Sequence, residues 1–149
     1  MKKAVSLILV LVLCLGLCAC GSNSESKFIG EYEFKGTVFE EHWRSGNTYR
    51  GDYLSCTEVL TLKSGGTGTF KTTTTEAGDY YKVGDVVSEG KVNWSAEGNY
   101  ITITFSGFSY DKSYGKNKTD TINRTSTYER KAGTLHSVSS GYLAYTKIS

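Results

Sequence analysis

From residue 28 onward, apolar and polar side chains alternate with a period of two, and short clusters of glycine, asparagine, aspartate and serine interrupt the alternation. Ile101, Ile103 and Phe105, for example, fall on one side of an extended chain, and the threonines between them fall on the other. No stretch of this part keeps the 3.6-residue period of an amphipathic helix. One apolar and one polar face is the pattern of half-buried strands, so the domain is predicted to be all-β.

Turn-forming residues separate the alternating runs. Ser64-Gly65-Gly66, Ala77-Gly78-Asp79 and Glu97-Gly98-Asn99 each stand between two runs, as in β-hairpins. Eight or nine strands are therefore expected at short spacing, in residues 28–38, 54–62, 68–75, 80–87, 92–95 and 100–108, and around Ile122, Tyr128, Leu135, Val138 and 142–148. Residues 38–52 show no clear pattern and are expected to form a long loop with one helical turn, a lid across one barrel end.

Consecutive hairpins favour an antiparallel meander, and its closure into an up-and-down β-barrel of about eight strands removes exposed strand edges. A β-sandwich is the alternative, but its usual cysteine pair around a core tryptophan is absent, since Cys56 is the only cysteine after Cys20. The domain therefore has no internal disulfide and depends on its hydrophobic core. Cys56 lies in an apolar alternation, so we interpret it as a buried, inert thiol.

The N-terminal segment has the features of an export signal. Lys2 and Lys3 precede an uncharged, mostly apolar stretch at 4–17, which is shorter than the roughly 20 residues of a membrane-spanning helix. An ordinary signal peptide or an uncut anchor are the alternatives that this pattern leaves open. Without these two lysines, the remaining basic side chains balance the 15 acidic ones. A neutral domain of this apolar content is expected to bind no nucleic acid and to be ordered.

Leu17-Cys18-Ala19-Cys20 resembles the processing site of bacterial lipoproteins. The resemblance implies that Cys20 receives a diacylglycerol and becomes the N-terminus after cleavage. It divides the chain into a signal peptide (1–19), a lipidated cysteine with a polar tether (20–27) and a folded domain (28–149). The protein is then expected at the cell membrane, lipid-anchored on the extracytoplasmic face, because two or more acyl chains anchor stably.

The domain itself resembles the lipocalin-like group of small bacterial lipoproteins. Four stretches carry the resemblance: Gly30-Glu31-Tyr32, the hairpin at 60–70, Trp94 to Ile103 with Gly98 and Ile101, and Tyr145-Thr146-Lys147-Ile148. The resemblance implies a barrel whose interior can hold a small molecule. Many functions share such barrels, so it supports the fold more than any ligand.

The sequence offers little catalytic chemistry. His42 and His136 are the only histidines, and His42 follows Glu40 and Glu41 in what we interpret as a solvated charge cluster of a loop. No nucleophile elbow, zinc-protease motif or phosphate loop is present. We therefore expect no enzyme activity, no cofactor and no metal site.

Two charged residues fall on the apolar face of their runs. If Leu54, Cys56 and Leu60 point inward, Glu58 does too, and Arg124 follows Ile122 in the same way. An interior Glu58–Arg124 pair could orient the polar head of a ligand, as interior arginines do in fatty-acid-binding barrels. A bulge that turns Glu58 outward, or a place at the barrel mouth, are the alternatives.

The interior aromatic residues either line a cavity or fill the barrel. The candidate cavity residues are Tyr32, Phe34, Glu58, Leu60, Leu62, Phe70, Tyr81, Trp94, Ile101, Ile103, Phe105, Arg124 and Tyr128. The predicted function is binding of a small apolar or amphipathic ligand by an anchored barrel. The alternative is a filled barrel that acts as an interaction or inhibitor module and binds an envelope protein or enzyme through its loops.

Overall fold

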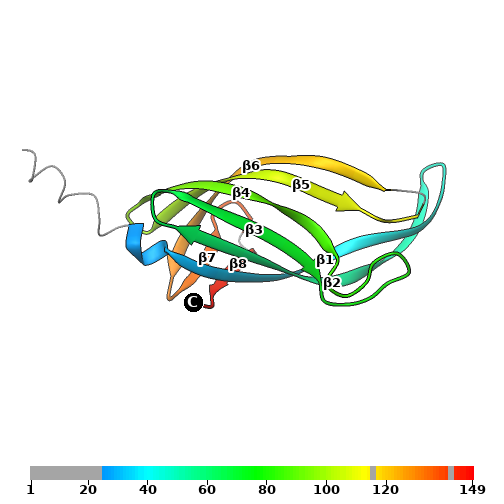
Figure 1. The fold of residues 1–149 in the computed structure, drawn as a ribbon, viewed down its shortest axis with the longest axis horizontal. Coiled ribbons are helices and arrows are strands. Elements are labelled where there is room, and N and C mark those ends of the chain that lie inside the picture. Colours follow the sequence, from blue (N-terminus) through cyan, green and yellow to red (C-terminus); the bar gives the residue numbers. More distant parts are fainter. Residues whose placement is uncertain (1–24, 115–116, 141–142) are drawn as a thin grey trace, which may run out of the picture.

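A computed structural model describes residues 25–114, 117–140 and 143–149. The predicted signal peptide and Cys20 lie outside these residues. A short 3-10 helix, η1, precedes eight strands (Figure 1). The strands are β1 (Gly30–Ser45), β2 (Thr48–Lys63), β3 (Thr67–Thr74), β4 (Val86–Glu97), β5 (Tyr100–Asp111), β6 (Lys118–Lys131), β7 (Thr134–Ser137) and β8 (Ala144–Lys147), and η1 is Ser26–Phe28. In the described part of the chain, no helix is long and apolar enough to cross a bilayer.

The eight strands form one closed antiparallel barrel in which each strand pairs with its neighbour in sequence. β8 closes the barrel by pairing with β1. The prediction of an up-and-down barrel of about eight strands is confirmed, and the sandwich alternative is excluded. The turns predicted at 64–66 and 97–99 connect β2 to β3 and β4 to β5, and Gly98 takes the positive φ of +57° that such a tight turn requires.

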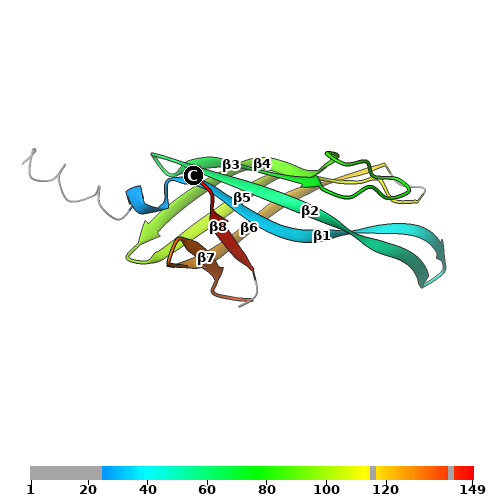
Figure 2. The ribbon, with the colours of Figure 1, turned by 90° about the horizontal axis from the view of Figure 1, so that it is seen from below.

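The prediction of a loop at 38–52 is wrong. β1 continues to Ser45 and β2 begins at Thr48, so the segment is a strand hairpin that extends beyond the other strands (Figures 1 and 2). A register shift between Glu41 and Trp43 bends it. Most side chains here are exposed or half-buried, so no core imposes the apolar alternation by which strands are recognised in sequence.

The prediction of a strand at 80–87 is also wrong in its first part. Residues 75–85 form a loop, and β4 begins at Val86 and includes the run expected at 92–95. The backbone N–H groups of Asp79, Tyr80 and Tyr81 donate to the carboxylate of Glu40. Because a side chain takes these donors, the segment has no free N–H groups for a strand ladder at these positions.

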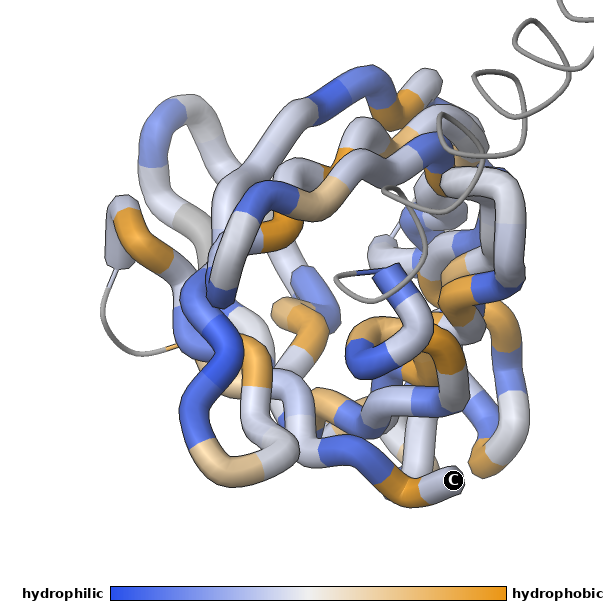
Figure 3. The backbone as a smooth tube through the Cα atoms, turned by 90° about the vertical axis from the view of Figure 1, so that its left-hand side faces the viewer, coloured by the Kyte–Doolittle hydropathy of each residue, from blue (hydrophilic) through white to orange (hydrophobic). Residues whose placement is uncertain are grey.

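A packed core fills the part of the barrel nearest η1, and Figure 3 looks along the barrel from this end. The strand ends around η1 contribute alternate residues, as β3 shows with its alternation of exposed and buried side chains. The core residues are Phe28, Tyr32, Leu60, Leu62, Phe70, Val92, Trp94, Ile101, Ile103, Phe105, Tyr128, Leu135 and Tyr145.

β7 and β8 are much shorter than the strands on either side of them. β7 pairs with only Tyr128–Lys131 of β6, and β8 pairs with Tyr32 and Glu33 of β1. Figure 2 shows this short hairpin confined to the half of the barrel near η1. Farther along, the sides of β1 and β6 that face each other have no strand partner among the described residues, and we call this gap in the ladder the opening in the barrel wall.

Candidate functional site: an interior cavity beside the short strands

A cavity of about 200 Å³ lies in the barrel interior, beyond the packed core. Six strands and the segment before β8 contribute to its wall. The lining residues are Phe34, Gly36, Thr37, Val38, Cys56, Glu58, Thr72, Val87, Arg124, Tyr128, Leu143 and Tyr145. Most of the lining is apolar or aromatic, with a few polar groups that converge on one point. This is the usual composition of a small-molecule site.

The polar groups of the lining converge on the carboxylate of Glu58 on β2. Glu58 pairs with Phe34 of β1 and Thr72 of β3 without a register shift, so the bulge that would turn it outward is absent from these ladders. The Thr72 hydroxyl donates to Glu58 at 2.8 Å and lies 2.7 Å from the Ser88 hydroxyl. The Tyr145 hydroxyl donates to the other carboxylate oxygen. The buried carboxylate therefore has the hydrogen-bond donors that burial requires.

Arg124 lies beside this carboxylate at the edge of the cavity. Its Nη2 is 4.0 Å from Glu58 Oε1, and its guanidinium carbon is 4.5 Å from the centroid of the Phe105 ring. The structure thus brings the predicted pair together. About half of the Arg124 side chain, 48%, stays exposed. A guanidinium has five N–H donors, so one held loosely by a carboxylate and a ring keeps donors for a further acceptor.

Aromatic rings form one wall. The Tyr145 ring centroid is 5.6 Å from that of Phe34 and 5.6 Å from that of Tyr128. Burial raises the pKa of Tyr145, and the nearby Glu58 charge adds to this, so its hydroxyl remains a hydrogen-bond donor. Burial also raises the pKa of the Cys56 thiol, with Glu58 again adding to it. A thiol of this kind is a poor nucleophile, which agrees with the interpretation of Cys56 as inert.

The structure divides the thirteen predicted cavity residues into three groups. Phe34, Glu58, Arg124 and Tyr128 line the cavity. Eight others are buried in the packed core around η1: Tyr32, Leu60, Leu62, Phe70, Trp94, Ile101, Ile103 and Phe105. The last residue, Tyr81, lies on the loop 75–85, away from this site.

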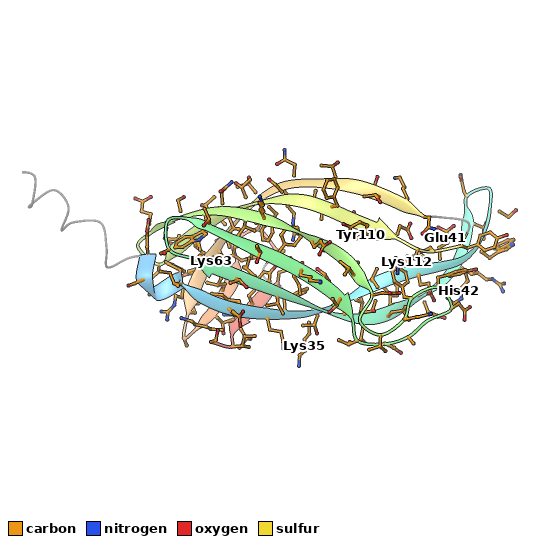
Figure 4. The ribbon with its side chains drawn as sticks, in the orientation of Figure 1. Lys35, Glu41, His42, Lys63, Tyr110 and Lys112 are labelled. Carbon is orange, nitrogen blue, oxygen red and sulfur yellow. The ribbon has the colours of Figure 1, made fainter. Side chains whose placement is uncertain are left out.

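Tyr81 closes the barrel at the end opposite η1. Its buried hydroxyl donates to the Tyr110 carbonyl at 3.2 Å and accepts from the Lys112 N–H at 3.0 Å. In Figure 4, Tyr110 and Lys112 lie at the same end of the molecule as Glu41 and His42, far from Lys63. The loop thus occupies the place at the barrel end that we predicted for residues 38–52.

The interpretation of Glu40 and Glu41 as solvated is wrong, because both side chains are buried. Glu40 accepts three backbone N–H groups of the loop, and His42 Nε2 lies 2.8 Å from its Oε2. Burial alone would raise the pKa of Glu40, but these hydrogen bonds outweigh it and lower the pKa. The hydrogen bond to Glu40 raises the pKa of His42, with help from the charges of Asp79 and Asp52. Among the described residues, no group of three or more histidine, cysteine, aspartate or glutamate side chains could hold a metal ion.

Sequence reasoning missed several lining residues, among them Thr72 and Tyr145. Thr72 follows Phe70 at a spacing of two, so the alternation itself placed it on the interior face. The signal that could have found both is the need of a buried carboxylate for hydroxyl or N–H donors.

Comparisons of the chain with protein-family models, with curated proteins and with solved structures found no match. The functional argument therefore depends on the cavity and on the side chains around it.

Proposed function

We propose that the protein is an extracytoplasmic lipoprotein that binds a small amphipathic molecule in the cavity beside Glu58 and Arg124. The observation that carries this proposal is an apolar cavity in which one arginine keeps unused N–H donors at the edge. An acceptor group on the ligand would lie against Arg124, and its apolar part would lie against Phe34, Val38 and Leu143.

The volume limits the ligand. A cavity of about 150 Å³ is enough for benzene, and drug-sized ligands occupy about 300–1,000 Å³. At about 200 Å³, this cavity fits a single substituted ring or a short branched chain. A long acyl chain would have to leave through the opening between β1 and β6.

Native mass spectrometry of the full chain, solubilised from source-cell membranes in mild detergent, tests ligand binding. The expected result is a small adduct that disappears on denaturation and is lost in Arg124→Ala. Arg50→Ala is the matched control, because Arg50 is on the extended hairpin and does not line the cavity. A clean apo mass for the wild type, or an adduct that Arg124→Ala retains, would contradict this site.

The anchor rests on the resemblance of Leu17-Cys18-Ala19-Cys20 to a lipoprotein signal. An anchor at Cys20 would precede η1, where the folded domain begins at the barrel end opposite the extended hairpin (Figure 1). Radiolabelled palmitate should enter the wild-type chain and fail to enter Cys20→Ser. Label in the mutant would exclude Cys20 as the attachment site.

A second role, as an interaction or inhibitor module, is favoured by aromatic side chains on the extended hairpin. Tyr53 is 70% exposed and Trp43 is 44% exposed, and the Tyr53 ring is 5.1 Å from that of Phe39. Exposed aromatic residues are enriched at protein interfaces. A photo-crosslinking residue at position 53 in source cells should then give one discrete adduct, and the same residue at the exposed Lys91 should not. Equal crosslinking from both positions would remove this candidate.

A further inference from the structure

The first part of β6 is a strand with one unpaired edge. β5 pairs with β6 along its whole length, from Tyr100 opposite Glu129 to Asp111 opposite Lys118. On the other side, β7 pairs only with Tyr128–Lys131. The side chains from Lys118 to Thr125 are exposed, except Ile122, which is half-buried. The strand therefore presents one long edge to the opening in the barrel wall.

Ladder geometry identifies the backbone groups on this edge. In an antiparallel ladder, alternate residues direct both N–H and C=O to the same side. The Thr127 carbonyl accepts from Val138, on the side of β7, and the Arg130 N–H donates to Asn99, on the side of β5. Odd-numbered residues of β6 therefore direct their backbone groups toward the open edge.

Side-chain contacts give the same assignment. In an antiparallel pair of strands, opposite residues whose backbone groups do not bond to each other lie closest together. Thr125 of β6 and Thr104 of β5 are such a pair, because their hydroxyls lie 3.0 Å apart. The open edge thus carries the N–H and C=O groups of Thr119, Thr121, Asn123 and Thr125. These groups have no hydrogen-bond partner among the described residues.

The facing edge of β1 is occupied at both ends. Glu31 pairs with Ile148 and Ser149, and Glu41 pairs with Ser113 and Tyr114. Lys35 and Thr37, between these two, direct their backbone groups into the same opening. In the part of the chain that the structure describes, these groups have no partner either.

We propose that this edge of β6 binds an extended segment of a partner protein, which adds as an antiparallel strand beside Lys118–Ser126. A repeating row of N–H and C=O groups is matched by the backbone of another extended chain, as in β-strand addition. The added strand would continue the direction and position of β7, which already occupies the same edge of β6. This edge adjoins the cavity and shares Arg124 with it. The added strand is held mainly by backbone groups of β6 that the cavity ligand does not use, so the two proposals can still fail independently.

The inward side chains determine which segments fit. Lys118, Asp120 and Arg124 point to the barrel side of the edge, with Ile122 between them. Inward charges protect natural edges against indiscriminate pairing. They also favour particular partner strands, because opposite charges across a ladder attract. A well-matched partner has acidic residues opposite Arg124 and Lys118, a basic residue opposite Asp120 and an apolar residue opposite Ile122.

A designed probe tests the edge directly. The acetylated and amidated peptide VTETVTKTE places complementary side chains opposite residues 126 to 118. Isothermal titration of the full chain in detergent should show saturable one-to-one binding. The same peptide N-methylated at its four threonines cannot donate to the edge and should bind at least about tenfold more weakly. The charge-reversed peptide VTKTVTETK should also bind more weakly.

The protein variants separate backbone pairing from side-chain effects. Asn123→Pro removes an N–H that faces the open edge and leaves the bonds to β5 intact, a position that proline tolerates in edge strands. It should weaken probe binding at least about tenfold, whereas Asn123→Ala should leave it unchanged. Circular dichroism checks that both variants fold. If the wild type does not bind the probe, or binds the N-methylated peptide equally well, the proposal is wrong, whatever the proline variant does.

Discussion

At the residue scale, Glu58 is the side chain that depends most on hydrogen-bond donors around it. It is a buried carboxylate in a largely apolar cavity, and hydroxyls from β3 and β8 donate to its two oxygens. Removing one donor from a buried ionised group leaves part of its desolvation uncompensated. Both the fold and the proposed site therefore depend on hydroxyls that the alternation pattern alone does not single out.

Tyr145→Phe should lower the free energy of unfolding by about 1–3 kcal/mol, because it leaves one oxygen of Glu58 without its hydroxyl donor. Urea unfolding measures the change. Tyr100→Phe, on an exposed tyrosine of β5, should change stability by less than about 0.5 kcal/mol. Equal effects of the two substitutions would show that the buried hydroxyl has no special role.

His42 gives the loop 75–85 a pH dependence. The hydrogen bond to Glu40 raises the pKa of His42 in the folded protein above its value of 6.5 in the unfolded chain. The contribution of His42 to the stability of the fold is therefore fully present below pH 6.5 and is lost as the pH rises through the folded-state pKa. The pKa of Glu40 is lowered from 4.5 in the folded protein. The contribution of Glu40 to stability is therefore fully present above pH 4.5 and is lost as the pH falls through the folded-state pKa. The groups that face His42 are Glu40, Asp52, Asp79 and the Tyr80 ring.

Thermal unfolding of the wild type should therefore show a maximum midpoint between about pH 4.5 and 6.5. His42→Gln should keep the acid limb and lose the fall above pH 6.5, because glutamine does not titrate. A wild-type midpoint that stays flat from pH 6 to 9 would contradict this role of His42.

At the element scale, the loop 75–85 is held to the barrel at several points, and Ser55, Thr74 and Lys112 bind its two ends. The Glu40 carboxylate binds it on one side, and the Tyr81 hydroxyl binds it on the other. Gly78 lies directly against Glu40, since a Cβ at this position would come within 2.3 Å of Oε2. The carboxylate cannot yield easily, because the loop N–H groups and His42 hold both of its oxygens.

Gly78→Ala should therefore displace Glu40 and expose the loop, with a loss of about 1–3 kcal/mol in stability and faster cleavage by protease within 75–85. Val83→Ala is the control on the same loop, because Val83 is 66% exposed. Unchanged proteolysis of Gly78→Ala would mean that Glu40 can move without releasing the loop.

The sequence predicted elements well where one face is buried and poorly elsewhere. The turns at 64–66 and 97–99 and the strands around Phe70 and Ile103 follow directly from alternation and glycine position. The extended hairpin was missed because solvent lies against much of it. The strand at 80–87 was misplaced because a distant carboxylate binds its backbone, and no local pattern reports such a contact.

The candidate site, too, could be predicted from the sequence only in part. Period-two alternation predicted that Glu58 and Arg124 would meet, because both belong to regular strands. Alternation could not distinguish residues that line a cavity from residues that fill the core, since both point to the interior face of their strands. The difference arises from the lengths of β7 and β8, which the sequence around 134–148 does not reveal.

At the scale of the whole molecule, barrel closure depends on a small contact. β8 pairs with β1 at two positions, and Lys147 Nζ lies 5.9 Å from the centroid of the Tyr32 ring. Tyr145 adds the buried side chain that joins this corner to the core. The last six residues therefore contribute more to the fold than their number suggests.

Deletion of residues 144–149 should remove the cooperative unfolding transition, because it uncovers the core at Tyr32 and leaves Glu58 with one hydroxyl donor fewer. Binding of a hydrophobic dye and loss of the near-ultraviolet circular dichroism would report this. Ile148→Thr, at a half-exposed side chain, should change stability by less than about 0.5 kcal/mol. A cooperative transition in the deletion variant would show that seven strands suffice.

The order of the strands around the barrel has a consequence for how the chain reaches its fold. Seven of the eight pairings join strands that are adjacent in sequence, and only the pairing of β8 with β1 joins the two ends of the domain. Pairings between neighbours need little loop closure and form early, whereas a pairing across the whole chain waits for the rest. A chain that leaves a ribosome or a translocation channel N-terminus first can therefore add one hairpin after another, and it becomes a barrel only when its last residues are free.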